Sequence, residues 1–182
     1  MKRVIVVPAD LAGAALDELK AWLAISTPAD DAALIALLRA ALDTCEAFTG
    51  TMPLEAECEE TLPADTGWHM LAARPVQSIT QVDTLADDGT RAPLAVGDYA
   101  VDLDADGTGR VQLLRRPATG RVTVRFTAGM ASEWNGLPDG MRHGALRLAA
   151  HHYRYRNEGS EAGTPPSAVV ALWQPWRRMR LV

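Results

Sequence analysis

Three aspartates followed by a glycine, Asp102, Asp104, Asp106 and Gly107, have the spacing of the first half of an EF-hand calcium loop. Such a loop needs a bidentate glutamate at its twelfth position, where this sequence has Leu113. The flanking segments are also typical of strands and not of helices. We therefore interpret this segment as the acidic turn of a β-hairpin, and we predict no calcium site.

The histidines lack the spacing of a metal site. His151 and His152 are adjacent, so on a helix their side chains point about 100° apart. His143 and His151 lie two helical turns apart, which is too far for the i, i+4 pair of zinc-binding helices. We interpret these three as boundary residues of a helix, and we predict neither a metal nor a cofactor for the protein.

Nucleophilic catalysis has no local signature in this chain. There is no G-x-S-x-G elbow and no glycine-rich phosphate loop, and neither Cys45 nor Cys58 lies in a catalytic motif. We predict that the protein is not an enzyme. Because catalytic groups can come from distant positions in a sequence, a small hydrolase-like enzyme that uses His69 or His151 with nearby carboxylates stays open as an alternative.

The second of two helices expected near the N-terminus is a poor candidate for reading DNA. A recognition helix needs basic and amide residues on its exposed face, but this segment holds one arginine among four acidic residues. These are Arg39, Asp30, Asp31, Asp43 and Glu46. Seven basic residues spread over 141–182 are too dispersed to form a strong phosphate-binding surface. A nucleic-acid-binding accessory protein is therefore a third and less favoured hypothesis.

The chain ends in aromatic and basic residues behind a link rich in glycine and proline, 159–167. Tryptophan and arginine are enriched at interface hot spots, and each tryptophan buries about 150–250 Å² when it docks. We therefore predict that this segment packs against a partner, with its own domain as the alternative surface. The predicted docking residues are Leu172, Trp173, Pro175, Trp176, Arg177, Arg178, Arg180 and Leu181.

Three helices are predicted to position these groups, over 10–25, 30–49 and 138–158. Apolar residues recur in each at the three- and four-residue steps of one helical face. Asp10 is expected to cap the first helix, Asp30 or Asp31 the second, and Gly50 is expected to end the second in a left-handed conformation. Pro175 argues against an uninterrupted helix near the C-terminus.

Between these helices, residues 55–128 alternate polar and apolar side chains in short segments separated by turn residues. We predict an antiparallel β-rich insertion and an α+β fold, in which a small helical bundle adjoins the insertion. The predicted domain covers 1–158, and 159–182 is predicted to be a flexible link with an extended C-terminal arm. The predicted strands are Glu57–Leu62, Trp68–Leu71, Ile79–Leu85, Asp98–Leu103, Arg110–Leu114 and Arg121–Thr127.

The formal net charge of −5 is unevenly distributed along the 182 residues. Residues 141–182 contain 7 basic and 2 acidic side chains, whereas residues 1–140 contain 11 basic and 21 acidic ones. The basic end of one copy can therefore meet the acidic body of another. The subunit-interface candidates are Arg142, Arg147, Arg154 and Arg156.

The two cysteines are too few for a secreted disulfide framework and suit a reducing cytoplasm. No apolar run approaches the roughly 20 residues that cross a bilayer, so we predict no membrane partner. The short apolar run Val4–Val7 is stopped by Pro8, which makes it too short for a signal peptide. We interpret it as an N-terminal strand or arm.

The order of these features resembles the head–tail connector, or adaptor, proteins of long-tailed phages, which have a counterpart in gene transfer agents. Three stretches carry the resemblance: Leu11–Ile25 with Asp30–Gly50, Leu137–Tyr153, and Ala171–Leu181. The order of the three stretches carries the resemblance more than any one of them does. The middle of the chain matches only in character.

The resemblance implies a structural subunit of the virion neck, made in the host cytoplasm. It implies a twelvefold ring of copies beneath the portal protein, joined on its other side to a stopper or tail-side neck protein. DNA would pass through the channel without sequence-specific binding. By the same resemblance, Ala168–Val182 would reach the portal.

Overall fold

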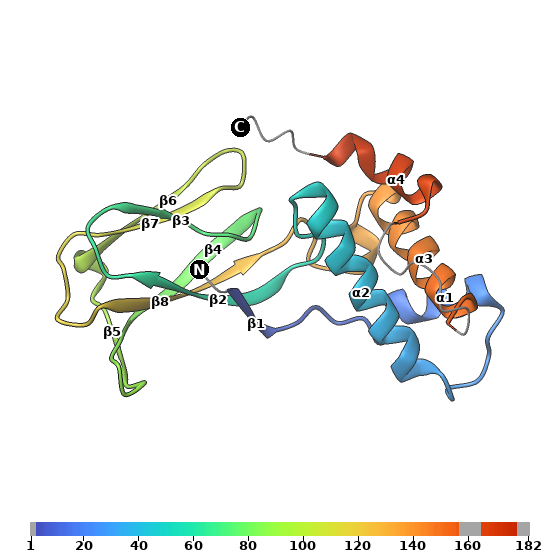
Figure 1. Cartoon of the computed structure of the whole chain (residues 1–182), viewed down its shortest axis with the longest axis horizontal. Coiled ribbons are helices and arrows are strands. Elements are labelled where there is room, and N and C mark those ends of the chain that lie inside the picture. Colours follow the sequence, from blue (N-terminus) through green and yellow to red (C-terminus); the bar gives the residue numbers. More distant parts are fainter. Residues whose placement is uncertain (1–2, 157–164, 178–182) are drawn as a thin grey trace. The chain divides into compact units, whose positions relative to one another are not determined.

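The computed structural model describes residues 3–156 and 165–177 of the chain, and these form two compact units. One unit consists of Met1–Pro8 and Glu55–Met130, and the other of Ala9–Leu54 and Ala131–Val182. The first is built of strands and the second of helices (Figure 1). This confirms the predicted α+β class with a β-rich middle. The division differs from the predicted single domain over 1–158, because the β-rich unit includes the N-terminal strand and the helical unit includes the C-terminal segment.

The helical unit contains α1 (Ala14–Leu23), α2 (Asp31–Thr49), α3 (Asp139–Arg154) and α4 (Ser167–Trp173). On α2 the buried side chains Leu34, Leu38, Ala41 and Cys45 recur at helical spacing and form its core face. Gly50 ends α2 with a φ of 73°, which is a conformation that favours glycine. The stripe and the C-cap that the sequence predicted are both confirmed.

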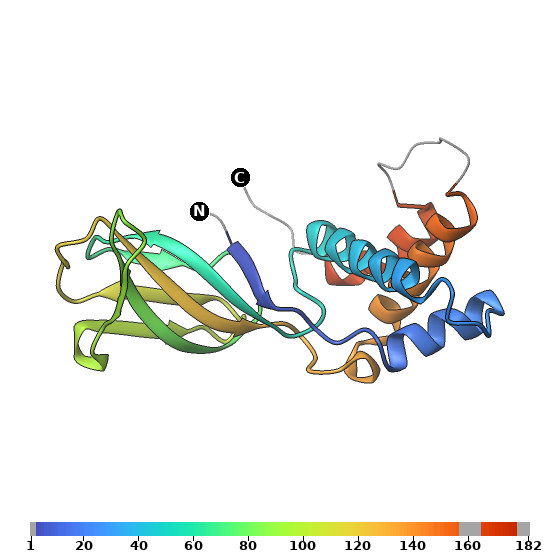
Figure 2. The same ribbon diagram turned by 90° about the horizontal axis from the view of Figure 1, so that it is seen from below.

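The β-rich unit holds two antiparallel sheets, which Figure 2 shows from a second side. The five-stranded sheet has the order β1-β2-β8-β4-β5 and the three-stranded sheet the order β3-β7-β6. Buried and half-buried residues alternate along β2, as expected for a sheet with one core face. The strands are β1 (Arg3–Val7), β2 (Ala56–Pro63), β3 (Trp68–Met70), β4 (Val76–Leu85), β5 (Arg91–Pro93), β6 (Tyr99–Leu103), β7 (Gly109–Leu113) and β8 (Arg121–Ala128).

Several element ends differ from the sequence prediction. The first helix starts at Ala14, because Asp10 accepts a hydrogen bond from the backbone N–H of Ala12 instead of capping the helix. Asp30 precedes α2 but its side chain makes no capping bond. The C-terminal segment was expected to be an extended arm. Residues 167–173 instead form α4. A 3₁₀ turn (Gln174–Trp176) follows, so the α-helix ends before Pro175, as the sequence predicted.

Candidate docking surfaces

The C-terminal segment packs against α3 within its own unit. Trp173 is fully buried, and its indole N–H donates a hydrogen bond to the backbone carbonyl of Met141 over 3.3 Å. The Trp173 ring also lies 6.2 Å from the ring of Phe48 on α2, centroid to centroid. Val169, one helical turn before Trp173, is buried as well. Trp173 therefore anchors α4 to two other helices.

Two glycines of α3 permit this close approach. A Cβ atom at Gly144 would collide with the indole ring of Trp173, and one at Gly140 would lie 3.1 Å from the carbonyl oxygen of Leu172. Glycines four residues apart lie on the same face of a helix, and here that face receives α4. The sequence contains this Gly-x-x-x-Gly spacing, which was the readable signal for the packing and which the sequence interpretation missed.

Two surfaces were considered for the terminal tryptophans: a partner, which was preferred, and their own domain. The preferred expectation is wrong for Trp173, because its indole is buried in its own unit and has a hydrogen-bond acceptor there. Trp176 is 36% exposed, and Pro175 and Arg177 are exposed too. The Arg177 guanidinium lies 5.4 Å from the Phe48 ring centroid.

The other predicted docking residues divide into two groups. Leu172 is half-buried on α4. Arg178, Arg180 and Leu181 lie outside the described residues. Among the described residues, the exposed part of the predicted docking segment consists of Pro175, Trp176 and Arg177, which follow the buried Trp173.

The four arginines predicted to lie at a subunit interface have different surroundings. Arg142 forms ion pairs with Asp139 (3.0 Å) and Glu18 (3.9 Å) of its own unit. Arg156 lies 4.5 Å from the ring centroid of Tyr153. Arg147 and Arg154 are exposed and lie seven residues apart, which places them on the same face of α3 two turns apart. These two have the environment expected of interface residues.

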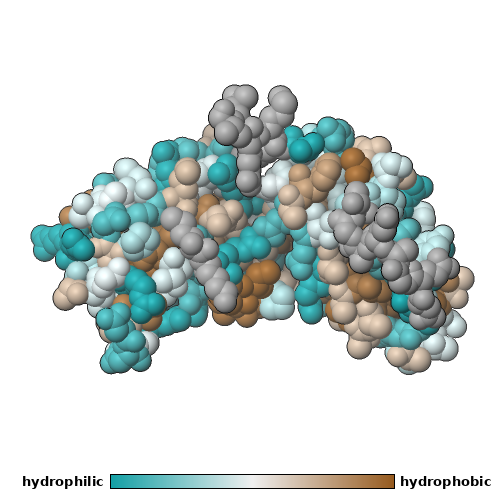
Figure 3. Space-filling view, in the orientation of Figure 1, coloured by the Kyte–Doolittle hydropathy of each residue, from teal (hydrophilic) through white to brown (hydrophobic). Residues whose placement is uncertain are grey.

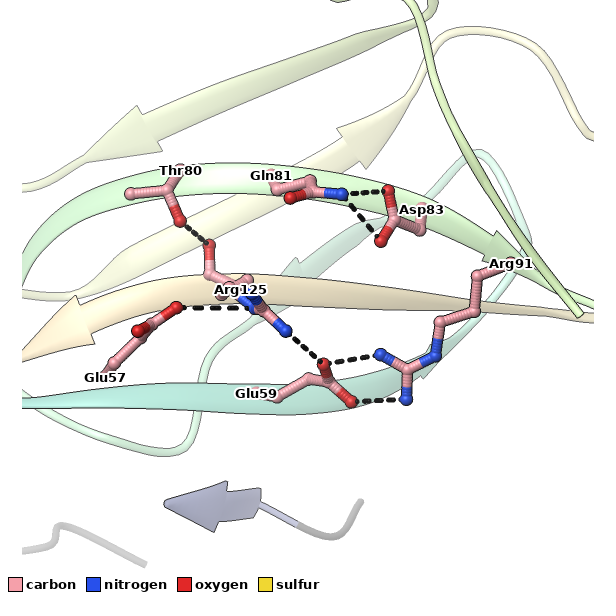
Figure 4. A network of polar contacts seen from close by, with 7 residues as sticks. All are labelled: Glu57, Glu59, Thr80, Gln81, Asp83, Arg91 and Arg125. Carbon is pink, nitrogen blue, oxygen red and sulfur yellow. Dashed lines mark hydrogen bonds and ion pairs between the residues drawn. The ribbon is translucent and has the colours of Figure 1, made fainter. Parts of the chain in front are cut away.

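One face of the five-stranded sheet carries a network of charged side chains, drawn in Figure 4. Arg91 on β5 donates two hydrogen bonds to Glu59 on β2, of 2.7 and 2.8 Å. Arg125 on β8 pairs with Glu57 over 3.4 Å and with Glu59 over 3.7 Å. The hydrogen bonds from Arg91 lower the pKa of the Glu59 carboxyl. Both arginines therefore have carboxylate partners within the sheet.

The outer face of the three-stranded sheet exposes large apolar side chains. Trp68, Met70 and Leu114 are each about half exposed, and the Arg110 guanidinium lies 6.0 Å from the Trp68 ring centroid. Exposed tryptophan, methionine and arginine together are typical of interaction surfaces. The sequence interpretation missed this face, because the alternation of β3 and β7 does not say which side is covered.

The acidic run at Asp102 is the turn of a hairpin, as predicted. It joins β6 to β7, and Gly107 has a φ of 81° in the turn. Arg110 pairs with Asp102 over 2.9 Å and with Asp104 over 2.8 Å. The carboxylates of this turn are thus partly neutralised by a side chain of the hairpin itself.

The fold places the histidines that were considered for catalysis in two different units. The ring of His69 lies 2.9 Å from Asp65 in the β-rich unit, whereas His151 and His152 lie on α3 of the helical unit. No cluster of three metal-binding side chains occurs within residues 3–156 and 165–177. Burial raises the pKa of the Cys45 thiol to about 12, so this thiol stays neutral. None of the described helices is long and apolar enough to span a bilayer.

Comparison with known proteins gives a match only at the level of structure. The sequence matches no protein-family profile and no curated protein. The fold is similar to a chain in the neck of an empty gene transfer agent particle, computed with C6 symmetry, with a TM-score of 0.78 and 28% identity. It is similar to chains of the native virion (TM-score 0.77) and of the native neck, computed with C12 symmetry (TM-score 0.76), at 27% identity each.

The comparisons support a structural neck protein. Each match covers 100% of this chain and 98% of the other, so the likeness includes both units and the C-terminal segment. It favours a structural, non-enzymatic role over the hydrolase-like and nucleic-acid-binding alternatives.

Proposed function

We propose that this chain is the head–tail adaptor of a tailed phage or gene transfer agent. In this proposal, copies form a ring in the neck of the virion, below the portal protein and above a stopper or tail-side protein. The observation that carries the proposal is the likeness to gene transfer agent chains over the full length, at identities of 27–28%. The necks named in these comparisons were computed with C6 and C12 symmetry, which supports a ring of twelve copies.

The C-terminal segment is the proposed contact with the portal. Trp173 would act as an internal anchor, and the exposed Trp176 and Arg177 would contact the portal together with Arg178, Arg180 and Leu181. An anchored segment loses less conformational freedom on docking than a free arm does, which favours affinity. Aromatic and arginine side chains also supply the energy of most interface hot spots.

The charge distribution suits a ring through which DNA moves. A ring needs two different, complementary faces on each copy, and the exposed Arg147 and Arg154 give α3 a basic face for an acidic neighbour. On the β-rich unit, Arg91 and Arg125 have carboxylate partners, which reduces the net positive charge that they present to phosphate groups. We propose that DNA crosses the ring without sequence-specific binding.

The first test is deletion of the gene in a cell that produces the particles. In the deletion strain we expect full heads and free tails that are not joined. Restoring the wild-type gene should restore joined particles. Tailed, infectious or DNA-transferring particles formed at normal yield without this chain would contradict the proposal.

A second test separates docking from folding. Removal of residues 178–182 keeps Trp173, so we expect a folded chain with weakened binding to purified portal. Removal of residues 167–182 takes Val169 and Trp173 out of the core, so we expect the helical unit itself to unfold. Circular dichroism and a portal-binding assay distinguish the two. Undiminished portal binding by the shorter deletion together with Trp176→Ala and Arg177→Ala would contradict the docking role.

A further inference from the structure

Strand β1 is an edge strand with unusual side chains. Its residues Val4, Ile5, Val6 and Val7 are all exposed, by between 38% and 53%. Figure 3, in the orientation of Figure 1, shows a hydrophobic patch where Figure 1 places β1. Soluble proteins normally protect such edges with charged residues or proline, because an open edge pairs with other chains.

The apolar side chains of β1 lie on both faces of the strand. In the pairing with β2, Ile5 lies opposite the buried Cys58, whereas Val4 and Val7 lie opposite Glu59 and Glu57 of the charged face. Among the described strands, β1 pairs only with β2. A strand that is apolar on both faces and has one edge open fits burial between two sheets.

The other edge strands of the β-rich unit, β3, β5 and β6, are not equally suited to pair with β1. The edge strands β3 and β5 have three residues each, and β5 carries Arg91 and Pro93, which oppose pairing. The edge strand β6 (Tyr99–Leu103) has five residues, the same number as β1, and its Val101 and Leu103 are exposed. Both strands are therefore long enough for a five-residue pairing, and each has exposed apolar side chains.

We infer that β1 of one copy adds to the free edge of β6 in the neighbouring copy, so that a sheet continues from subunit to subunit around the ring. This inference rests on the proposed ring. Strand addition supplies affinity through main-chain hydrogen bonds, and the exposed valines supply burial. The two edges are different surfaces of the same chain, which is the heterologous arrangement that a closed ring requires.

The test is cysteine cross-linking in assembled particles. Four double variants combine Val4→Cys or Val6→Cys with Val101→Cys or Leu103→Cys, and a short bismaleimide joins thiols that lie close together. The native Cys45 and Cys58 are buried, so they give little background. We expect at least one pair to yield a ladder of covalent multimers on a denaturing gel, and each single variant to remain a monomer.

Two results would overturn the inference. One is the absence of ladders from all four pairs in particles that contain the protein and carry tails. The other is a covalent dimer from Val4→Cys or Val6→Cys alone, which would show β1 pairing with β1. Failure of the proposed function is a separate observation, because the protein would then be missing from the purified particles.

A charge substitution provides an independent check with a matched control. Val4→Lys and Val96→Lys each replace an exposed valine, of 52% and 82% exposure, and Val96 lies outside both β1 and β6. Lysine on an edge strand is compatible with folding. We expect Val4→Lys to fold normally by circular dichroism and to reduce incorporation into necks at least tenfold, while Val96→Lys reduces it much less. Equal incorporation of the two variants would contradict a role for β1.

Discussion

Trp173 and Trp176 lie three residues apart and have different surroundings. Trp173 is inaccessible to solvent and donates a hydrogen bond to Met141, whereas Trp176 keeps 36% of its surface exposed. The same residue type therefore has two different environments in one short segment. Composition alone predicted an interface for both, because the sequence does not reveal that Gly144 leaves room for an indole ring.

The two tryptophans give the first prediction. Trp173→Ala removes a large buried side chain and should lower the free energy of unfolding of the helical unit by about 3–5 kcal/mol. Trp176→Ala should change that stability by less than about 1 kcal/mol, yet weaken portal binding by about 2 kcal/mol, or roughly 30-fold, as for a hot-spot residue. Urea denaturation and a binding titration measure the two effects. Equal losses of stability would contradict the distinction.

Gly144 gives the second prediction. Alanine usually stabilises a helix relative to glycine by up to about 1 kcal/mol, but a Cβ at this position would collide with Trp173. We expect Gly144→Ala to destabilise the helical unit by about 1–3 kcal/mol, as overpacked cores do. Gly120→Ala is the control, because nothing lies within 4 Å of a Cβ there. A stabilised Gly144→Ala variant would contradict the packing of α4 on α3.

The third prediction concerns two adjacent glutamates of β2, Glu59 and Glu60, whose contributions to stability depend on pH in opposite directions. Burial raises the pKa of Glu60, whose Oε2 accepts a hydrogen bond from the Ala72 N–H over 2.9 Å. The folded protein therefore binds the proton of Glu60 more tightly than the unfolded chain does. The contribution of Glu60 to stability is complete below its ordinary pKa of about 4.3 and is lost as pH rises through the raised pKa. Hydrogen bonds from Arg91 lower the pKa of Glu59. Glu59 thus contributes stability above about 4.3 that is lost as pH falls through the lowered pKa.

Denaturant melts at several pH values test these signs. Glu60→Gln should gain stability relative to wild type as pH rises from 4 to 7, by on the order of 1–3 kcal/mol, because the variant keeps an oxygen for Ala72 but carries no charge. Glu59→Gln should lose stability relative to wild type over the same interval. A Glu60 variant whose difference from wild type does not change with pH would contradict the account of its burial.

At the scale of elements, periodicity predicted most of the fold. The apolar steps of α2 and the alternation of β8 each match the structure to within a residue or two, because one face of each element forms the core. Two elements were missed for physical reasons. β5 has three exposed residues and no pattern to read, and α4 is only seven residues long and follows two prolines.

The candidate surfaces were less predictable than the fold. The sequence identified the C-terminal segment, because its composition is unusual, but it did not identify the open edge of β1 or the apolar face around Trp68. A run such as Val4–Val7 is equally typical of a buried strand, and only the strand order shows that no other described strand pairs with its second edge. Exposure depends on neighbours that are distant in the sequence.

Helix α3 gives the fourth prediction. Arg147→Glu with Arg154→Glu should leave the fold intact, because both side chains are exposed, but should weaken association between copies at low salt. Surface charge pairs contribute about 1 kcal/mol or less each, so the loss should shrink as salt is raised. Sedimentation of ring assemblies at two salt concentrations measures this effect. Arg142→Glu is the comparison, since its ion pairs with Asp139 and Glu18 predict a loss of stability.

At the scale of the whole molecule, two compact units suit an assembly protein. Each unit has its own core and its own exposed surfaces: the β1 edge and the Trp68 face on one, and α3 with the C-terminal segment on the other. A ring subunit must contact neighbours on two sides and partners above and below. The number of separate surfaces on this chain matches that requirement better than it matches a single enzymatic site.

The most direct test of the account is a cryo-EM reconstruction of the neck of the native particle. We expect twelve copies of this chain between portal and tail, with Trp173 inside its own helical unit and Trp176 and Arg177 in contact with the portal. A neck that lacks this chain, or a ring in which Trp176 and Arg177 contact only their own subunit, would contradict the central claim.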